Sequence, residues 1–531
     1  MSFDCKMNIT KLNIEKNVLE LSAVINCPFD PNAALPKVKI VFESGGKTRR
    51  LPILVTDFIR DEESDRCTVV CEYTYLIDQL FYKFKINGDV TAKINFYYGE
   101  NEVLSVPFTV SPDALSDDSN VKADCENGSI IISSADQIIK HAKPQRRRFT
   151  IRYLIHVIAK LCFAPLEFYY KRLCKKDVVP NRVTFMSGRR NELGGNSKFV
   201  YDIIQDRSDI DFQFLLFSDS KGHRKLGNII KFLKLYATSK VVIIDDYFRL
   251  LNWVDKRGDV KLYQLWHACG AFKTFGFARL GKPGGPTQKS KNHRMYDYAI
   301  VSSKNIAKDY AESFGLSDAC ILATGIPRTD IFMDPDYSDS VKARFYEKHP
   351  QLKDKKIMLF APTFRGNGQM SAYYPTDKFN PKEVYEALGG QYAILIKLHP
   401  FCRERFEIPQ QYADFILDLS REDELNDLLF VTDLLVTDYS SAVFEASLLN
   451  IPMLFYAYDL EEYIAERDFY YDFQSFVPGK IVFSESELTE AVLNNDFEQE
   501  KVNGFKTKFF DDIDGCSSQR VAEHILKNLS E

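Results

Sequence analysis

The stretch from residue 182 to residue 303 contains five short apolar runs: RVTFMSG (182–188), FQFLLFSD (212–219), KVVIIDDY (240–247), KLYQLWH (261–267) and YAIVSS (298–303). Stretches with helical spacing separate these runs. Apolar strands that alternate with helices are typical of βαβ units, in which helices cover both faces of a parallel sheet. We therefore predict a Rossmann-like domain over residues 178–330.

A second series of apolar runs follows a hinge region at residues 326–355. The runs are KIMLFAPTF (356–364), YAILIKLHP (392–400), DFILDLS (414–420), DLLVTDY (433–439) and PMLFYAYD (452–459). They predict a second Rossmann-like domain over residues 331–531, which ends in a C-terminal helix. Paired doubly wound domains bind ligands at the carboxyl ends of their strands, so we expect the functional site in the crevice between the two domains.

The N-terminal part of the chain predicts a different architecture. Residues 1–110 contain alternating or β-branched runs such as VLELSAVI (18–25) and VTAKINFYY (90–98), which turn residues separate. This pattern is typical of an antiparallel β-sandwich, here an accessory module. Residues 111–142 are polar and acidic, which indicates a linker that ends in a short strand near residues 130–132.

The segment at residues 143–177 is strongly basic. Residues 143–176 contain ten Lys or Arg and a single acidic residue, Glu167, and their apolar residues have near-helical spacing. One interpretation is a helical connector whose basic face is solvated. The other is an amphipathic surface that lies on an anionic membrane leaflet. The sequence leaves both open.

Composition excludes several classes of protein. The 531 residues carry a formal net charge of −5, which argues against a protein whose main partner is nucleic acid. The eleven cysteines are scattered without a CxxC pair, and the N-terminus has no signal-peptide pattern. No apolar run reaches the roughly 20 residues of a spanning helix. We expect a cytoplasmic protein with reduced thiols.

Two of the eight histidines occupy equivalent positions in the two predicted domains. His267 follows YQLW and His399 follows LIKL, so each lies at the carboxyl end of a predicted strand. One such histidine is more often a structural residue. Two in matching positions favour a shared site, in which a neutral imidazole accepts or donates a proton.

The second domain also carries the residue types of an anion site. In TDYSSAVFEA (437–446) a helix is expected to start near Ser440 or Ser441, where free backbone N–H groups bind anions. An ordinary serine N-cap is the alternative. Arg365 and its neighbour Thr363 offer donors for a pair of phosphate oxygens. The set predicted to hold a diphosphate is Thr363, Arg365, Asp438, Ser440, Ser441 and Glu445.

The first domain opens with the glycine-rich segment SGRRNELGGNSKFVYDII (187–204). Its Arg189 and Arg190 fit an anionic acceptor, although a plain strand-to-helix turn explains the glycines equally well. No HExxH or HxH spacing is present, so we predict no metal-ligand set. Assistance by Mg²⁺ stays open.

Several motifs together resemble one protein family. They are WHACGAFKTFGF (266–277), TGIPRTDIF (324–332), APTFR (361–365), IKLHP (396–400) and the long segment from VTDYSSAVFEA to ERDFYYDF (436–473). Over about residues 180–525 the chain is similar to the CDP-glycerol glycerophosphotransferases of teichoic-acid synthesis, a module that capsule polymerases also use. The resemblance implies a GT-B-like fold and a peripheral enzyme on the cytoplasmic membrane face.

The resemblance also implies an activity and roles for residues. The expected enzyme moves glycerol phosphate or ribitol phosphate from CDP-glycerol or CDP-ribitol to a lipid-linked polyol phosphate and releases CMP. His267 is then the general base, and His399 with the diphosphate set holds the donor. Glu445 suits a ribose or cytosine contact. Accessory or acceptor roles fall to Arg189, Arg190, Arg328, Arg467 and Asp468.

This sequence departs from the family pattern at the first motif, where Ala268 and Cys269 separate His267 from Gly270. Two other classes of function stay open. A glycosyltransferase that uses a sugar nucleotide shares the two-domain architecture. A non-enzymatic membrane-surface protein would account for the β module and the basic segment alone.

Overall fold

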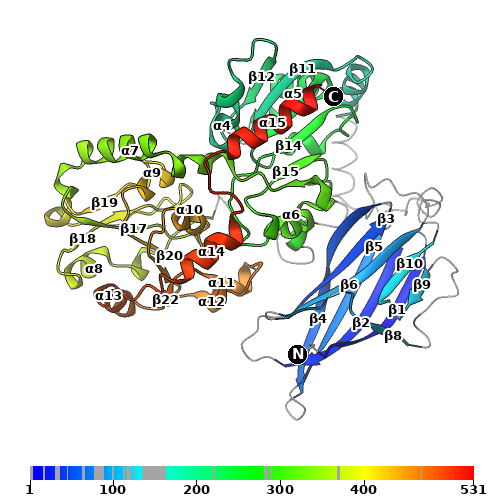
Figure 1. Cartoon of the computed structure of the whole chain (residues 1–531), viewed down its shortest axis with the longest axis horizontal. Coiled ribbons are helices and arrows are strands. Elements are labelled where there is room, and N and C mark those ends of the chain that lie inside the picture. The colour runs from blue at the N-terminus through cyan, green and yellow to red at the C-terminus, as the bar shows by residue number, and fades with distance from the viewer. Residues whose placement is uncertain are drawn as a thin grey trace.

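The computed structural model describes residues 4–15, 18–29, 36–44, 46–61, 66–76, 89–98, 101–103, 105–111, 114, 121–125, 127–133, 163–218, 222–279, 285–286, 290–366, 371–467 and 469–530. Three sheets organise these residues (Figure 1). One is the N-terminal antiparallel assembly, and the other two are parallel sheets of six strands each.

The N-terminal strands form the expected β-sandwich. They are β1 (Lys6–Glu15), β2 (Val18–Pro28), β3 (Lys37–Ser44), β4 (Lys47–Asp61), β5 (Arg66–Leu76), β6 (Val90–Tyr98), β7 (Asn101–Val103), β8 (Phe108–Val110), β9 (Val121–Asp124) and β10 (Ser129–Ile132). Strand β4 pairs with β3 over residues 47–53 and with β5 over residues 54–61, so it passes from one group of strands to the other. One apolar core serves both groups.

The region predicted to be a linker, residues 111–142, contains strands β9 and β10. Strand β10 pairs with β6 and with β9, so both strands belong to the sandwich. The polar composition of this region suggested a linker, but Ile130 and Ile132 are buried in the sandwich core. The expected strand near residues 130–132 is thus present.

The first parallel sheet has the order β12-β11-β13-β14-β15-β16. Its strands are β11 (Val179–Ser187), β12 (Asp211–Leu216), β13 (Ser239–Ile244), β14 (Lys261–Gln264), β15 (Tyr298–Ile300) and β16 (Ile321–Leu322). The helices with it are α4 (Gly195–Ile204), α5 (Leu226–Thr238) and α6 (Ala307–Phe314). Residues 241–244 of β13 are fully buried, as expected for a central strand that is covered on both faces. The predicted α/β class is confirmed.

The second parallel sheet has the order β19-β18-β17-β20-β21-β22. Its strands are β17 (Lys356–Phe360), β18 (Tyr392–Ile396), β19 (Ile416–Asp418), β20 (Leu434–Thr437), β21 (Met453–Tyr456) and β22 (Lys480–Val482). Its helices are α7 (Pro335–Lys348), α8 (Pro381–Ala387), α9 (Leu425–Leu429), α10 (Ala442–Leu448), α11 (Leu460–Glu466), α12 (Phe473–Phe476), α13 (Glu485–Leu493) and α14 (Lys501–Phe509). The strand order reverses next to β17, which places a ligand crevice at its carboxyl end.

The C-terminal helix α15 (Ser517–Ser530) leaves the second domain and packs on the first (Figure 1). The Asp330 carboxylate accepts hydrogen bonds from the backbone N–H groups of Ser517 and Ser518, at 3.0 and 2.7 Å. Farther along α15, Nδ1 of His524 lies 2.7 Å from the Tyr263 hydroxyl of β14. The assignment of this helix to the second domain therefore needs correction. Its apolar stripe predicts a buried face but not the domain that buries it.

The basic segment is described from residue 163 onward. Residues 163–173 form a helix on the first Rossmann-like domain, where the Phe163 ring meets Trp253 at 4.6 Å between centroids and Tyr170 is buried. Phe168 on the other face is 70% exposed. Residues 143–162, with most of the basic charge, lie outside the described residues. In the part of the chain described, none of the helices combines the length and the hydropathy of a membrane span.

Candidate active site

His267 lies in a strained turn after β14. The Gln264 side chain accepts a hydrogen bond of 2.8 Å from the Trp266 backbone N–H, and Trp266 adopts a positive φ of 53°. This conformation is uncommon for a large residue and is found where the surrounding structure enforces it. The turn leaves the His267 side chain 41% exposed. The predicted base is thus accessible.

A carboxylate and an arginine flank the His267 imidazole. Its Nδ1 lies 3.3 Å from Oδ1 of Asp246, which also forms an ion pair with Arg189. Partial burial of the ring and the positive charges of Arg189 and Arg328 lower the pKa of His267 well below its usual value. The imidazole is therefore neutral at physiological pH. A neutral imidazole at this position can accept a proton from a hydroxyl group.

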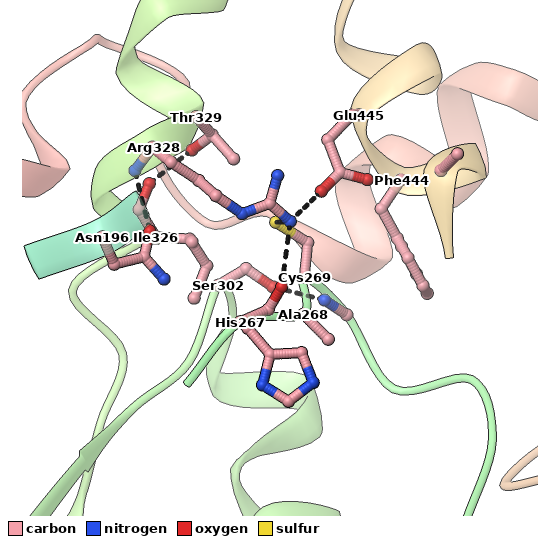
Figure 2. Close-up of polar contacts among 12 residues, drawn as sticks. Asn196, His267, Ala268, Cys269, Ser302, Ile326, Arg328, Thr329, Phe444 and Glu445 are labelled. Carbon is pink, nitrogen blue, oxygen red and sulfur yellow. Dashed lines mark hydrogen bonds and ion pairs between the residues drawn. The ribbon is translucent and has the colours of Figure 1, made fainter. Parts of the chain in front are cut away.

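The backbone of the His267 turn is held by two side chains (Figure 2). The Asn196 amide, at the start of α4, donates to the carbonyl oxygens of Leu265 and Trp266 at 3.1 and 2.7 Å. Its oxygen accepts from the Arg328 backbone N–H at 3.0 Å. Nη2 of Arg328 in turn donates to the His267 carbonyl oxygen at 3.3 Å. The turn is therefore anchored from both sides.

Arg328 also links the two Rossmann-like domains (Figure 2). It belongs to the 3-10 helix Pro327–Met333, and its Nη2 forms an ion pair with the carboxylate of Glu445 in α10. The Glu445 side chain is 3% exposed and that of Arg328 is 19% exposed. The structure thus pairs an expected accessory residue with an expected donor ligand. The ribose or cytosine contact of Glu445 stays a prediction.

Gly270, in the motif WHACGAFKTFGF, lies against the second domain. It has a positive φ of 59°, and a Cβ atom there would lie 2.0 Å from a ring carbon of Phe444. Only glycine fits both the conformation and this contact with α10. The two extra residues before it, Ala268 and Cys269, are accommodated, and the Cys269 sulfur lies 3.7 Å from Nη2 of Arg328. The motif therefore packs directly against the second domain.

Arg365 on the opposite side of the crevice is held by the protein itself. Its Nε and Nη2 donate to both carboxylate oxygens of Asp459, at 2.6 and 2.8 Å. Its Nη1 donates to Oδ2 of Asp438 at 2.9 Å and to the Thr363 carbonyl oxygen at 2.6 Å. Four of its five N–H donors are thus used by neighbouring residues. We expected the guanidinium group of Arg365 to bind a pair of phosphate oxygens, but most of its donors are already used. Phosphate binding by this residue stays a prediction.

The other predicted donor residues surround Arg365. Oδ1 of Asp438 accepts from the Thr363 backbone N–H at 2.7 Å. The Thr363 hydroxyl is buried and, within the described part of the chain, has no hydrogen-bond partner. Helix α10 begins at Ala442, whose N–H donates to the Ser440 hydroxyl at 3.2 Å, and Ser441 is exposed. The unsatisfied Thr363 hydroxyl suits a ligand oxygen.

His399 is a neutral imidazole. Its Nδ1 accepts a hydrogen bond of 3.2 Å from the Phe401 backbone N–H, and its ring packs against Phe364 and Phe401. Burial, with the positive charges of Lys273 and Arg189, lowers the pKa of His399 to about 4. The positive charge of Arg189 therefore lowers the pKa of both His267 and His399, so this first-domain arginine lies near both predicted histidines.

The remaining predicted residues differ in how they are held. Arg189 pairs with Asp246, and the positive charge of Arg190 counteracts the rise that burial causes in the pKa of Asp245. Arg467 donates to the Gly366 carbonyl oxygen. Asp468 lies outside the described residues. Among the described residues there is also no cluster of three His, Cys, Asp or Glu side chains arranged for a metal ion.

Sequence reasoning missed four residues of the site. They are Asn196, Asp246, Lys273 and Asp459. Asp246 and Asp459 follow the apolar runs KVVII and PMLFYA, so the same rule that found His267 applied to them. Nothing local marked Asn196 or Lys273, because their importance arises from contacts with distant segments.

Comparisons with known proteins support these observations. A model of the family CDP-Glycerol:Poly(glycerophosphate) glycerophosphotransferase matches residues 168–527. A teichoic acid poly(ribitol-phosphate) polymerase of Bacillus spizizenii is 44% identical over 370 residues, which are 70% of this chain and 60% of that protein. The chain thus spans less than two thirds of this relative.

Three further comparisons give the same family and fold. Teichoic acid ribitol-phosphate polymerase TarK of Staphylococcus aureus is 37% identical over 79% of this chain and 82% of its own length. A teichoic acid glycerol-phosphate primase of Bacillus subtilis is 35% identical over 57% of this chain and 77% of its own. The solved structure of the wall teichoic acid polymerase TagF superimposes with a TM-score of 0.58 at 20% identity and covers 72% of this chain and 99% of TagF. This likeness confirms the GT-B-like fold.

Proposed function

The chain belongs to the CDP-glycerol:poly(glycerophosphate) glycerophosphotransferase family, and we propose that it transfers an alditol phosphate from a CDP-alditol to a hydroxyl group of a teichoic-acid-type polymer. CMP is the second product. The observation that carries this proposal is an exposed His267 on the first domain and His399 with the Arg365 cluster on the second, with the charge of Arg189 lowering the pKa of both histidines. A base on one side and anion-binding groups on the other match the needs of phosphoryl transfer.

The geometry suggests how each bond changes. The acceptor hydroxyl oxygen forms a bond to the β-phosphorus, and the bond from that phosphorus to the oxygen bridging to CMP breaks. Nε2 of His267 takes the hydroxyl proton, a contribution of about 100-fold to 10,000-fold in rate. Positive charges in the crevice stabilise the charge that moves onto the leaving CMP.

The donor proposed is CDP-ribitol rather than CDP-glycerol. The two relatives described above at 44% and 37% identity are named for ribitol phosphate, and the glycerol-phosphate primase shares 35% over a shorter part of this chain.

The test measures release of the nucleotide product from three donors in parallel, each with a polyol phosphate primer: CMP from CDP-ribitol, CMP from CDP-glycerol, and UDP from a UDP-sugar. We expect release with CDP-ribitol to exceed release with CDP-glycerol, and none with the UDP-sugar. Release with the UDP-sugar alone would establish a glycosyltransferase instead. No release with any of the three would favour a non-enzymatic surface protein.

A lipid-linked acceptor and attachment to an anionic cytoplasmic leaflet are further parts of this proposal. The helix at residues 163–173 supports them, because Phe168 and Tyr169 are exposed beside the exposed Lys171 and Arg172. Exposed aromatic and basic side chains on one helix suit a membrane interface.

Cosedimentation with anionic liposomes tests the attachment. Each basic residue near an anionic surface contributes about 1 kcal/mol. The variant with Arg146, Arg147, Arg148 and Arg152 all changed to Gln should therefore cosediment much less than the parent. The parent should also be released at high salt. Equal cosedimentation of the two proteins would leave the segment as a structural connector.

A further inference from the structure

Lys273 of the first domain reaches the donor side of the crevice. Its backbone forms a bridge with Phe469, and the Tyr470 N–H donates to the Phe272 carbonyl oxygen at 2.9 Å. This pairing holds the motif WHACGAFK against a segment of the second domain. The Lys273 Nζ lies 5.3 Å from the centroid of the Tyr463 ring. The Arg365 guanidinium lies 5.1 Å from the same ring.

The ammonium group of Lys273 has no anionic partner. Among the described residues it forms neither a hydrogen bond nor an ion pair. The carboxylate that acts on the charge of Lys273 is that of Asp438. Its oxygens already accept hydrogen bonds from Arg365 and from backbone N–H groups. Lys273 is half-buried, so its ammonium group is available to pair with an anion that enters the site.

Other charges around Lys273 agree with an anion site. Burial, together with Arg467 and Arg365, lowers the pKa of Lys273 to about 7, although Asp438 opposes the shift. The positive charge of Lys273 also contributes to the lowered pKa of His399. The positive groups of the crevice therefore converge on one place, and the other arginines there already have protein partners.

We propose that Lys273 binds the diphosphate of the nucleotide donor. It supplies the positive charge that Arg365 does not, because two carboxylates already bind Arg365. This inference rests on the proposed function, since the anion is the donor's diphosphate. The donor is favoured over the phosphates of the acceptor polymer because His399, Asp438, Arg365 and Tyr463 all belong to the second domain. A diphosphate beside Nζ favours the charged lysine, so donor binding takes up a proton above neutral pH.

Isothermal titration calorimetry with CDP-ribitol, CDP-glycerol and CMP tests the proposal on the full chain. Lys273→Met should weaken binding of the CDP-alditol about 10-fold to 100-fold, the range for a hydrogen bond to a charged group. Lys273→Arg should retain most of the affinity. Lys291→Met is the matched control, because Lys291 pairs with exposed Asp255, and it should bind like the parent.

Proton uptake separates this role from a merely structural one. Titrations at pH 8 in buffers of different ionisation enthalpy should show uptake by the parent on donor binding and none by Lys273→Met or Lys273→Arg. The Met variant should unfold at about the same temperature as the parent, because the Lys273 ammonium group forms no ion pair that the substitution would remove. Donor affinity and proton uptake like those of the parent would overturn the proposal. If the parent itself binds no CDP-alditol, the proposed function fails instead.

The N-terminal sandwich makes contacts with both Rossmann-like domains. Lys37 of β3 donates to the carbonyl oxygens of Phe469 and Tyr470 in the second domain. Lys39 of the same strand forms an ion pair with Glu312 of α6 in the first domain, and both side chains are largely buried. Phe277, which ends the motif WHACGAFKTFGF, is buried in the sandwich core. The sandwich thus holds both Rossmann-like domains.

From these contacts we infer that the sandwich positions Lys273 through the segment at residues 469–470. Lys37 holds the carbonyl oxygens of the segment whose other backbone groups pair with residues 272–273. Lys37→Met should weaken donor binding about 2-fold to 10-fold, the range for one ordinary hydrogen bond. Lys93→Met is the control, because the Lys93 ion pair with Glu43 stays within the sandwich, at 3.5 Å.

A double-mutant cycle tests whether Lys37 acts through Lys273. The effect of Lys37→Met on donor affinity should disappear when Lys273 is already Met. An undiminished effect in that background would overturn the inference, as would equal effects of Lys37→Met and Lys93→Met. Thermal unfolding of each variant, measured alongside, identifies any change that arises from loss of folded protein.

Discussion

The two walls of the crevice hold their key residues in opposite ways. On the first domain, His267 is 41% exposed and meets a single carboxylate, Asp246, at 3.3 Å. On the second domain, Arg365 is 8% exposed and is bound by Asp438 and Asp459 together. The first wall therefore has a side chain, that of His267, which can exchange a proton with a substrate. On the second wall, ion pairs fix the position of Arg365 before any ligand binds. Substitution of His267 should therefore change the rate, and substitution of Arg365 should change the stability.

The largest effect is expected from His267→Ala. The variant should lose about 100-fold to 10,000-fold in kcat, because no base takes the acceptor proton. Donor affinity and the unfolding midpoint should stay close to the parent values, since the side chain is open to the crevice. CMP release and donor calorimetry measure the two quantities. An equal loss of donor affinity would contradict the separation of the two walls.

Arg365→Ala is the corresponding change on the second wall. It leaves Asp438 buried without its cation, so the free energy of unfolding should fall by about 3 to 5 kcal/mol. Donor affinity should fall as well, because Thr363 and Asp438 lose their anchor. Urea unfolding measures the first effect. Exposed Arg403 provides the control, and Arg403→Ala should unfold like the parent.

Glu445→Gln tests the ion pair that joins the two walls. The change removes the charge that pairs with Arg328 and should reduce the free energy of unfolding by about 1.5 to 3 kcal/mol. If Glu445 serves to join the domains, calorimetric donor affinity should stay within about twofold of the parent. A tenfold loss of affinity at unchanged stability would instead support the ribose or cytosine contact.

Arg189→Ala tests the electrostatics of the first wall and has the smallest expected effect. Arg189 lowers the pKa of His267, so its removal should raise that pKa and frees Asp246 to favour the imidazolium. The acid limb of the kcat profile should therefore move to higher pH, by roughly 0.5 to 1 unit at this partly exposed site. A limb that moves to lower pH, or does not move, would exclude His267 as the titrating base.

Much of the fold was accessible from the sequence because it depends on local patterns. Apolar runs of strand length that alternate with helices predicted both parallel sheets, and the ends of those runs identified His267 and His399. The linker at residues 111–142 and the placement of α15 were predicted less well. A short strand or an amphipathic helix shows that it has a face to bury, but not which distant surface buries it.

The sequence by itself determined the element types, the two-domain α/β class, the family and the identity of the two histidines. Only the tertiary structure decided how the charges pair. It showed that Arg365 is committed to Asp438 and Asp459, that Arg328 joins Glu445, and that Lys273 forms neither a hydrogen bond nor an ion pair within the described residues. The physical reason is that side-chain pairing depends on distances between segments far apart in the chain, which periodicity and spacing do not encode.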